Sequence, residues 1–357
     1  MVKISKCIRK SILDIPTYVP GAPATISIRA KLNSNENPLG PSEEVLRAIA
    51  ETLPNVNRYP IAPRSLLAKI ADYVSLAPEN VLLGNGSDEL VDAVVKTFVN
   101  PGESTVVCPP TFEMYEIFTR LIGGRVKSVP LRRDFSWDVD GILKAVSKRT
   151  KIVFICSPNN PTGSIISEED LLRIAEKDVV VVVDEAYIEF ADKSLVSLLR
   201  KQNNLVFLRT FSKAFGLAGL RIGYALADSE TIKYIRCARP PFPVNILALK
   251  AAEVAVEDRE RLKQVKALVS AGKQYLYSEL AKIRCVKTYP SEANFILVNI
   301  AKTGFTSTEI VDALFKEGVL VRDGAPFRGL GKGYVRVTVG TMEENELFIQ
   351  ALKNVVA

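Results

Sequence analysis

The sequence contains no histidine. This absence excludes a Ser-His-Asp triad, histidine-ligated metals and acid–base chemistry on an imidazole ring. Any catalysis must therefore use lysine, tyrosine, carboxylate or cysteine side chains, or a bound cofactor. Cysteine is also scarce, because the five cysteines lie far apart and form no C-x-x-C pair. Neither a zinc site nor a disulfide framework is expected, and the pattern suits a reducing compartment.

Long apolar runs and clustered charge are missing as well. No apolar run approaches the roughly 20 residues of a membrane span, and the basic N-terminus, MVKISKCIRKSI, lacks the apolar region of a secretory signal. The formal net charge of +7 comes from scattered residues, which fit small anionic ligands better than nucleic acid. We therefore expect a cytoplasmic protein without a metal ion and without membrane or nucleic-acid partners.

The order of apolar segments predicts an α/β fold. Short apolar runs alternate with helix-like segments up to about residue 243, which indicates a largely parallel sheet covered on both faces. A long helical stretch is then expected over about 246–282, followed by shorter strands and a closing helix that would form a smaller α/β domain. The predicted divisions are an N-terminal arm (1–35), a large domain (36–243) and a small domain (244–357).

Polar segments follow several predicted strands of the large domain. In open α/β sheets, ligands bind at the carboxyl ends of the strands. Each segment alone also suits an ordinary turn or helix start, but their joint occurrence indicates a site that combines an amide, a carboxylate, a phenol and an amine. These segments are Gly84–Glu89, Ser157–Gly163, Asp184–Tyr187 and Arg209–Lys213.

Lys213 is the candidate nucleophile of this site. It follows the apolar run 205–208 and precedes small and apolar residues, and loss of hydration would lower the pKa of its amine. Such a lysine can hold an aldehyde cofactor as a Schiff base, and pyridoxal phosphate has the matching handles. Asp184 suits its pyridinium nitrogen, whereas Asn160 and Tyr187 can donate to its phenolate oxygen.

The phosphate of that cofactor needs hydroxyls, backbone N–H groups and a cation. The carboxylates of Asp88 and Glu89 would repel a phosphate at this helix start unless they are turned away. Phe112, which follows another strand, offers an aromatic face for the ring. The candidate phosphate ligands are Gly86, Ser87, Thr210, Ser212 and Arg221.

These motifs, with others along the chain, carry a family resemblance. The sequence resembles the fold-type I, pyridoxal-phosphate-dependent aminotransferases over nearly its whole length, and most of all their histidinol-phosphate branch. The lysine, Asp-x-x-Tyr and Asn-Pro-x-Gly motifs are specific for the superfamily. Besides the segments above, the resemblance rests on Lys31–Pro41, Arg58–Pro60, Thr210–Arg221, Val319–Asp323 and Val335–Gly340.

The resemblance implies a fold and an assembly. It implies a large domain with a mostly parallel seven-stranded sheet, a smaller α/β domain, and a homodimer with shared active sites. Tyr59 would reach the cofactor phosphate of the neighbouring subunit. The cofactor-binding residues would also include Asp88.

The resemblance also implies catalytic and substrate-binding residues. Lys213 would carry the cofactor and move the proton between the substrate Cα and the cofactor. Arg336 matches the position that holds a carboxylate in related aminotransferases, and with Arg322 it would grip a substrate phosphate, since two planar guanidinium groups suit a dianion. The remaining substrate residues would be Tyr18 and Asn37.

The reaction expected from these features is transamination of histidinol phosphate by 2-oxoglutarate, which gives imidazole-acetol phosphate and glutamate in histidine biosynthesis. An aromatic amino-acid aminotransferase remains an alternative, because Arg336 can equally bind a carboxylate. A threonine-phosphate decarboxylase of the same fold could use the same arginine pair. A non-catalytic regulatory protein is disfavoured by Lys213, and a Rossmann dehydrogenase by the lack of G-x-G-x-x-G after an early strand.

Overall fold

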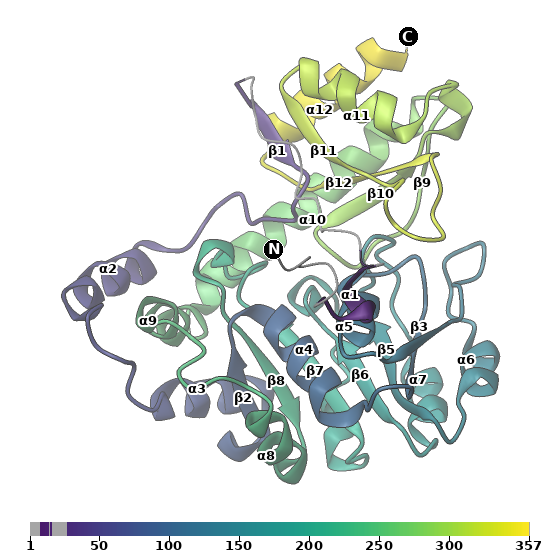
Figure 1. The fold of residues 1–357 in the computed structure, drawn as a ribbon. Helices are drawn as coiled ribbons and strands as arrows, with labels where there is room; N and C mark the ends of the chain where they lie inside the picture. Colours follow the sequence, from purple (N-terminus) through teal and green to yellow (C-terminus); the bar gives the residue numbers. More distant parts are fainter. Residues whose placement is uncertain (1–7, 14, 16–26, 357) are drawn as a thin grey trace, which may run out of the picture.

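Two β-sheets organise the computed structural model, which describes residues 8–13, 15 and 27–356 (Figure 1). The first sheet has seven strands in the order β2-β8-β7-β6-β5-β3-β4. Only β8 runs antiparallel to its neighbours, so the expected mostly parallel sheet is confirmed. The strands are β2 (Val81–Gly84), β3 (Ser104–Val107), β4 (Arg125–Ser128), β5 (Thr150–Cys156), β6 (Val180–Asp184), β7 (Leu205–Thr210) and β8 (Gly223–Ala227).

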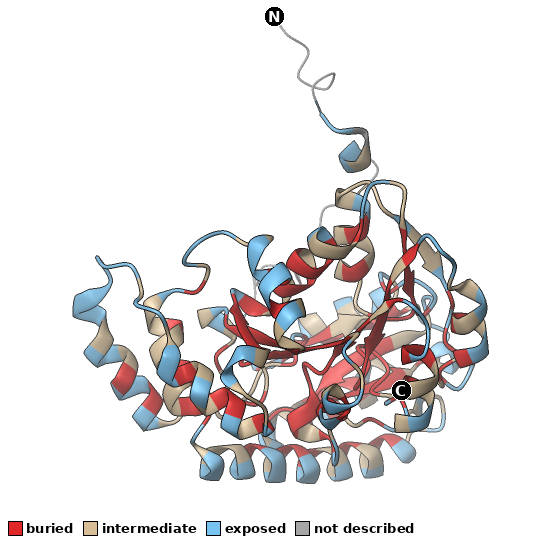
Figure 2. Cartoon of the chain, turned by 90° about the horizontal axis from the view of Figure 1, so that it is seen from below, coloured by how far each residue is buried: buried red, intermediate tan, exposed pale blue. Residues whose placement is uncertain are grey.

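The central strands of this sheet are apolar throughout because both of their faces are covered. Along β6, Val181 and Val183 pack into one core cluster and Val182 into another, as the alternation of a strand requires. Figure 2 shows buried strands between helices whose outer faces are exposed. The helices of this part are α2 (Glu43–Thr52), α3 (Arg64–Val74), α4 (Gly86–Phe98), α5 (Met114–Leu121), α6 (Val139–Ala145), α7 (Glu168–Ala175) and α8 (Ser229–Cys237).

The second sheet combines one strand from the N-terminal part of the chain with four strands from its C-terminal part. Its order is β1-β11-β12-β10-β9, with β1 parallel to β11 and the other pairs antiparallel. A short helix, α1 (Lys10–Leu13), precedes β1, and α11 (Ser307–Lys316) and α12 (Met342–Val356) belong to this upper part of Figure 1. The strands are β1 (Ala30–Leu32), β9 (Lys287–Thr288), β10 (Phe295–Asn299), β11 (Val319–Asp323) and β12 (Tyr334–Thr338).

The single helical stretch expected over 246–282 is wrong, because the structure has two helices there: α9 (Ile246–Ala255) and α10 (Arg259–Ala281). Asp258 between them accepts a hydrogen bond from the N–H of Arg261 at 2.9 Å, and this N-cap starts a new helix. Buried alanines of α9 belong to a core cluster of the first sheet. Among the described residues, no helix combines the length and apolar character needed to cross a membrane.

Candidate active site

A cavity of about 500 Å³ lies between the carboxyl ends of the first sheet and the second sheet. Cys156, Asp184 and Leu208 are register partners on β5, β6 and β7, so these strands bring the residues that follow them to the same level. Most of the residues singled out in the sequence line this cavity. They are Ser87, Asp88, Phe112, Asn160, Asp184, Tyr187, Thr210, Ser212, Lys213, Arg221, Arg322 and Arg336.

Three other candidates do not line this cavity, namely Gly86, Asn37 and Tyr59. The amide of Asn37 donates to the carbonyl of Ala214 at 2.9 Å and accepts from the N–H of Leu39, so this side chain holds the backbone beside the cavity. Tyr59 is 79% exposed and stacks on Phe242. Tyr18 lies outside the described residues.

Arg221 defines the end of the cavity where α4 begins. Its guanidinium contacts the Ser212 hydroxyl at 3.4 Å and the Asp88 carboxylate at 3.1 Å. Gly86 has φ +75°, a conformation that favours glycine, and Nη2 of Arg221 lies 2.6 Å from where a Cβ would be. Glu89 is turned away and pairs with Arg239. The expectation that both carboxylates turn away is wrong for Asp88, which lines the cavity because it pairs with Arg221. Arg221 and the N-terminus of α4 still bring together a cation and N–H donors of the kind that suit a phosphate.

Lys213 lies at the centre of the cavity, after the end of β7. Its Nζ donates to the carbonyl of Ser34 at 2.9 Å and lies 5.8 Å from the centroid of the Tyr187 ring. Burial lowers the pKa of the Lys213 amine from 10.5 to about 8, and the positive charge of the nearby Arg336 guanidinium adds to this effect. About a tenth of these amines are then neutral at pH 7, so Lys213 can act as a nucleophile.

This lowered pKa predicts the pH dependence of Lys213 reactivity. Only the neutral amine reacts, so the rate of reductive methylation of Lys213 should rise about tenfold per pH unit and level off above its pKa of about 8. Quantitative mass spectrometry of the labelled peptide measures this rate. The control is the chain in denaturant, where labelling should keep rising towards about pH 10; equal profiles for the folded and denatured chains would refute the lowered pKa.

Asp184 is a buried carboxylate at the end of β6. Its Oδ2 accepts a hydrogen bond from the Tyr115 hydroxyl at 2.6 Å, and its Oδ1 accepts from the N–H of Ala186 at 3.1 Å. Burial raises the pKa of Asp184 to about 6, while these two hydrogen bonds oppose the rise. The carboxylate is thus held in place with its charge partly compensated, ready for a cationic partner in the cavity.

Tyr115 was missed in the sequence. Its ring is fully buried and stacks on Phe154, with centroids 4.7 Å apart. A tyrosine on an amphipathic helix such as α5 is usually a core residue, and no spacing in the sequence relates it to Asp184, which lies 69 residues away. Only the folded sheet brings the two side chains together.

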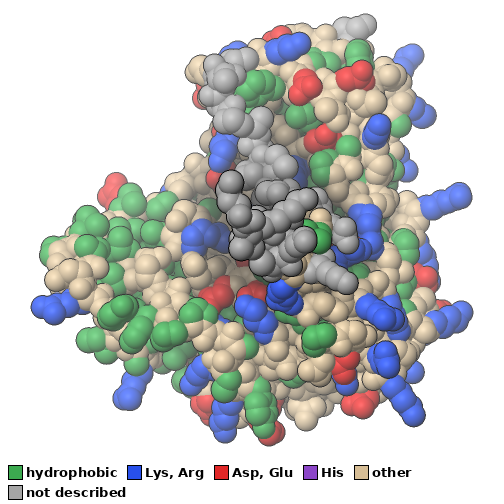
Figure 3. All heavy atoms as spheres, in the orientation of Figure 1, with side chains coloured by type: hydrophobic (Ala, Val, Ile, Leu, Met, Phe, Trp, Pro, Cys, Tyr) green, Lys and Arg blue, Asp and Glu red, His purple; other side chains and the backbone are tan. Residues whose placement is uncertain are grey.

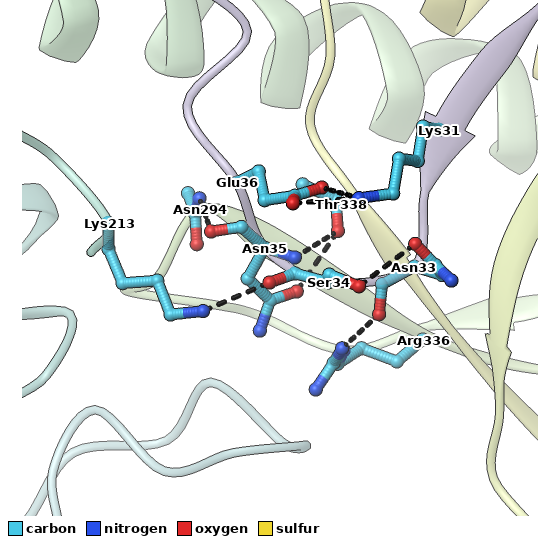
Figure 4. Close-up of polar contacts among 9 residues, drawn as sticks. All are labelled: Lys31, Asn33, Ser34, Asn35, Glu36, Lys213, Asn294, Arg336 and Thr338. Carbon is cyan, nitrogen blue, oxygen red and sulfur yellow. Dashed lines mark hydrogen bonds and ion pairs between the residues drawn. The ribbon is translucent and has the colours of Figure 1, made fainter. Parts of the chain in front are cut away.

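Two arginines from adjacent strands complete the cavity. Arg322 on β11 and Arg336 on β12 are register partners, and the Phe327 ring lies 5.5 and 5.9 Å from their guanidinium groups. Arg336 donates to Oδ1 of Asn160 at 2.5 Å and to the carbonyl of Asn33 at 2.6 Å. Figure 4 shows Lys213 and Arg336 on either side of segment 33–36. One cavity therefore contains a lysine amine of lowered pKa and two guanidinium groups.

Comparisons with known proteins show which family has this fold. Residues 28–352 match the family described as aminotransferase class I and II. The chain belongs to this family. This aminotransferase is 40% identical to a histidinol-phosphate aminotransferase of Methanothermobacter thermautotrophicus, over 100% of the chain and 98% of that protein.

Solved structures of histidinol-phosphate aminotransferases have the same fold as this chain. The histidinol-phosphate aminotransferase of Clostridium acetobutylicum gives a TM-score of 0.86 at 27% identity, covering 92% of this chain and 99% of its own. That of Sinorhizobium meliloti, in complex with pyridoxal-5'-phosphate, gives 0.85 at 29% identity, covering 92% and 91%. The aminotransferase described here thus falls, by sequence and by fold, among the histidinol-phosphate aminotransferases.

Proposed function

We propose that this aminotransferase uses pyridoxal phosphate to transfer the amino group of L-histidinol phosphate to 2-oxoglutarate, a step of histidine biosynthesis. The observation that carries the proposal is the cavity itself, which Lys213 and Asp184 line together with the arginine pair. An amine of lowered pKa and a buried carboxylate suit the cofactor. The two guanidinium groups suit a substrate phosphate, and the relatives of this name support the choice of substrate.

The residues present fit pyridoxal phosphate at each of its polar groups. Lys213 would bind its aldehyde carbon, and Asp184 would pair with its ring nitrogen. The oxygen of the Asn160 amide accepts from Arg336, which leaves the amide N–H groups to donate, together with Tyr187, to the phenolic oxygen. Arg221 and the N-terminus of α4 would hold the phosphate.

When bound, the cofactor withdraws electrons from the substrate Cα. Asp184 would keep the ring nitrogen protonated, because its negative charge is held against that nitrogen by Tyr115 and the N–H of Ala186. The Lys213 amine would act as the base that takes the proton from the substrate Cα and as the acid that delivers it to the cofactor. Its lowered pKa keeps part of the amine neutral for this task.

We also propose that the active enzyme is a homodimer. Exposed apolar side chains gather on the side of the molecule that carries α2, α3 and α9 (Figure 3), and a contiguous apolar surface of this kind is typical of an interface. Tyr59 belongs to this surface and would reach the cofactor phosphate of the neighbouring subunit. The large exposed apolar residues of this region are Leu46, Leu53, Val56, Tyr59, Ile61 and Phe242.

A half-reaction titration tests the choice of substrate. The absorbance of the bound cofactor is followed while histidinol phosphate, phenylalanine or threonine phosphate is added separately. Histidinol phosphate should discharge the absorbance at the lowest concentration, and 2-oxoglutarate should restore it. A stronger response to phenylalanine would indicate an aromatic aminotransferase, and release of carbon dioxide from threonine phosphate without an oxo-acid acceptor would indicate a decarboxylase.

Variants of the arginine pair sharpen this test. Arg322→Met should lower kcat/KM for histidinol phosphate about 10- to 100-fold, as loss of a charge-assisted hydrogen bond to a dianion predicts, with a smaller effect on glutamate in the reverse half-reaction. Arg336→Met should lower kcat/KM for both histidinol phosphate and glutamate, because the glutamate carboxylate also needs this guanidinium. Equal losses for both substrates in Arg322→Met would contradict the assignment of Arg322 to the phosphate.

A further inference from the structure

Asn35 connects the second sheet to Tyr187 in the cavity. Its side chain is 1% exposed, and its Nδ2 donates to the Tyr187 hydroxyl at 3.0 Å. We propose that Asn35 is a positioning residue, which directs the hydroxyl proton of Tyr187 towards the phenolic oxygen of the cofactor. The inference rests on the cofactor named in the proposed function and adds the residue that orients one of its ligands.

The polarity of the Asn35 amide is fixed by Thr338 on β12. The Thr338 hydroxyl accepts from the backbone N–H of Asn35 at 2.9 Å and donates its own proton to Oδ1 of Asn35 at 3.0 Å. Because Oδ1 is occupied as an acceptor, the N–H groups of the amide face Tyr187 (Figure 4 shows the contacts with Thr338). The amide therefore acts on Tyr187 only as a donor.

The backbone of Asn35 is held just as firmly. Its φ of +54° lies in the left-handed region, where asparagine is among the few side chains that are tolerated. Its carbonyl accepts from the Asn294 amide at 3.1 Å. The neighbouring Ser34 carbonyl accepts from Lys213, so the same short segment contacts both the lysine and the tyrosine.

This geometry decides what the Tyr187 hydroxyl can do. A phenol has one proton, and when its oxygen accepts from Asn35, that proton must point to another acceptor. Tyr187 lines the cavity, and the acceptor there would be the phenolic oxygen of the cofactor. A hydrogen bond from Tyr187 would stabilise the negative charge of this phenolic oxygen. It would therefore lower the affinity of the cofactor–lysine pair for the proton between that oxygen and the lysine nitrogen.

Other charges act on the same two groups and must stay constant in a test. Burial raises the pKa of Tyr187, while Arg336 and the Asn35 hydrogen bond lower it. The charged and titratable groups that act on Tyr187 or Lys213 from the surrounding elements are Glu36, Asp88, Cys156, Asp184, Arg221 and Arg336. Substitutions at position 35 that introduce no charge leave all of these in place.

The experiment is a spectroscopic pH titration of the holoenzyme without any amino substrate. Asn35→Gly keeps the left-handed backbone and removes the donor, so the pH midpoint of the cofactor absorbance should rise by about one unit. Tyr187→Phe should raise the midpoint at least as far. In the double variant, Asn35→Gly should add no further shift, because its effect passes through the tyrosine.

A further variant separates positioning from general support. Asn294→Ala weakens the same segment without touching Tyr187, so it should lower the melting temperature and leave the midpoint unchanged. Additive shifts for Asn35→Gly and Tyr187→Phe would overturn the inference alone, whereas a wild-type protein that shows no cofactor absorbance would overturn the proposed function with it.

Discussion

Lys213→Ala is expected to abolish transamination, with a loss of kcat on the order of 10⁴-fold or more, as removal of a central catalytic group does in other enzymes. The variant loses both the amine that would hold the cofactor and the base at the substrate Cα. Steady-state turnover with histidinol phosphate and 2-oxoglutarate measures the loss. The absorbance of the lysine-bound cofactor should disappear in the same variant.

The fold should survive this substitution, because the Lys213 side chain makes a single described hydrogen bond, to the Ser34 carbonyl. A matched control is Lys193→Ala, which removes an exposed lysine that pairs with Glu168 on the surface and should leave turnover unchanged, since such pairs contribute little. Circular dichroism of both variants reports the fold. Turnover of Lys213→Ala near the wild-type level would refute the catalytic role of this lysine.

Asp184→Asn is expected to lower kcat by about 10²- to 10³-fold, the usual loss when a preorganised electrostatic partner is removed. An amide of the same shape fills the site but brings no negative charge to the ring nitrogen. Stopped-flow measurement of the half-reaction with histidinol phosphate gives the rate. Asp178→Asn is the control, because Asp178 is an exposed residue in the loop before β6, whereas Asp184 ends the same strand.

The pH profile should distinguish the charge of Asp184 from its position. The carboxylate is the active form, and its pKa of about 6 is kept from rising further by the Tyr115 hydrogen bond. Tyr115→Phe removes that bond, so the acid limb of the rate profile should move to higher pH while the rate at alkaline pH recovers. Asp184→Asn should be impaired at every pH. An unchanged acid limb in Tyr115→Phe would show that Tyr115 does not support this charge.

Much of the fold, and many of the side chains that line the cavity, could be predicted from the sequence because the information is local. A buried parallel strand is a short apolar run, and the residues at and just after its end lie at the carboxyl ends of the strands, as Asp184 and Lys213 do. The lack of histidine restricted the chemistry further. The family motifs then supplied the arginine pair, which local patterns alone would leave as ordinary surface residues.

Other features depend on contacts that no local pattern contains. The strand β8 runs antiparallel within a mostly parallel sheet, and its direction is decided by where it pairs, between the preceding strand β7 and the distant strand β2. Tyr115 and Asn35 meet their partners 69 and 152 residues away. The helix break at Asp258 has a local signal, the N-cap aspartate, but the residues on both sides of it suit a helix, so the sequence favours one continuous helix.

The place of β1 in the second sheet has a consequence for folding during synthesis. Ala30 of β1 pairs with Val319 of β11, so a segment made early must wait for a strand made almost at the end. Until then, the chain that follows β1, including Ser34 and Asn35, lacks its partner Thr338. Contacts so distant in sequence form late and slowly. A ribosome-bound chain that ends before β12 could complete the first sheet but could not assemble a cavity able to bind substrate.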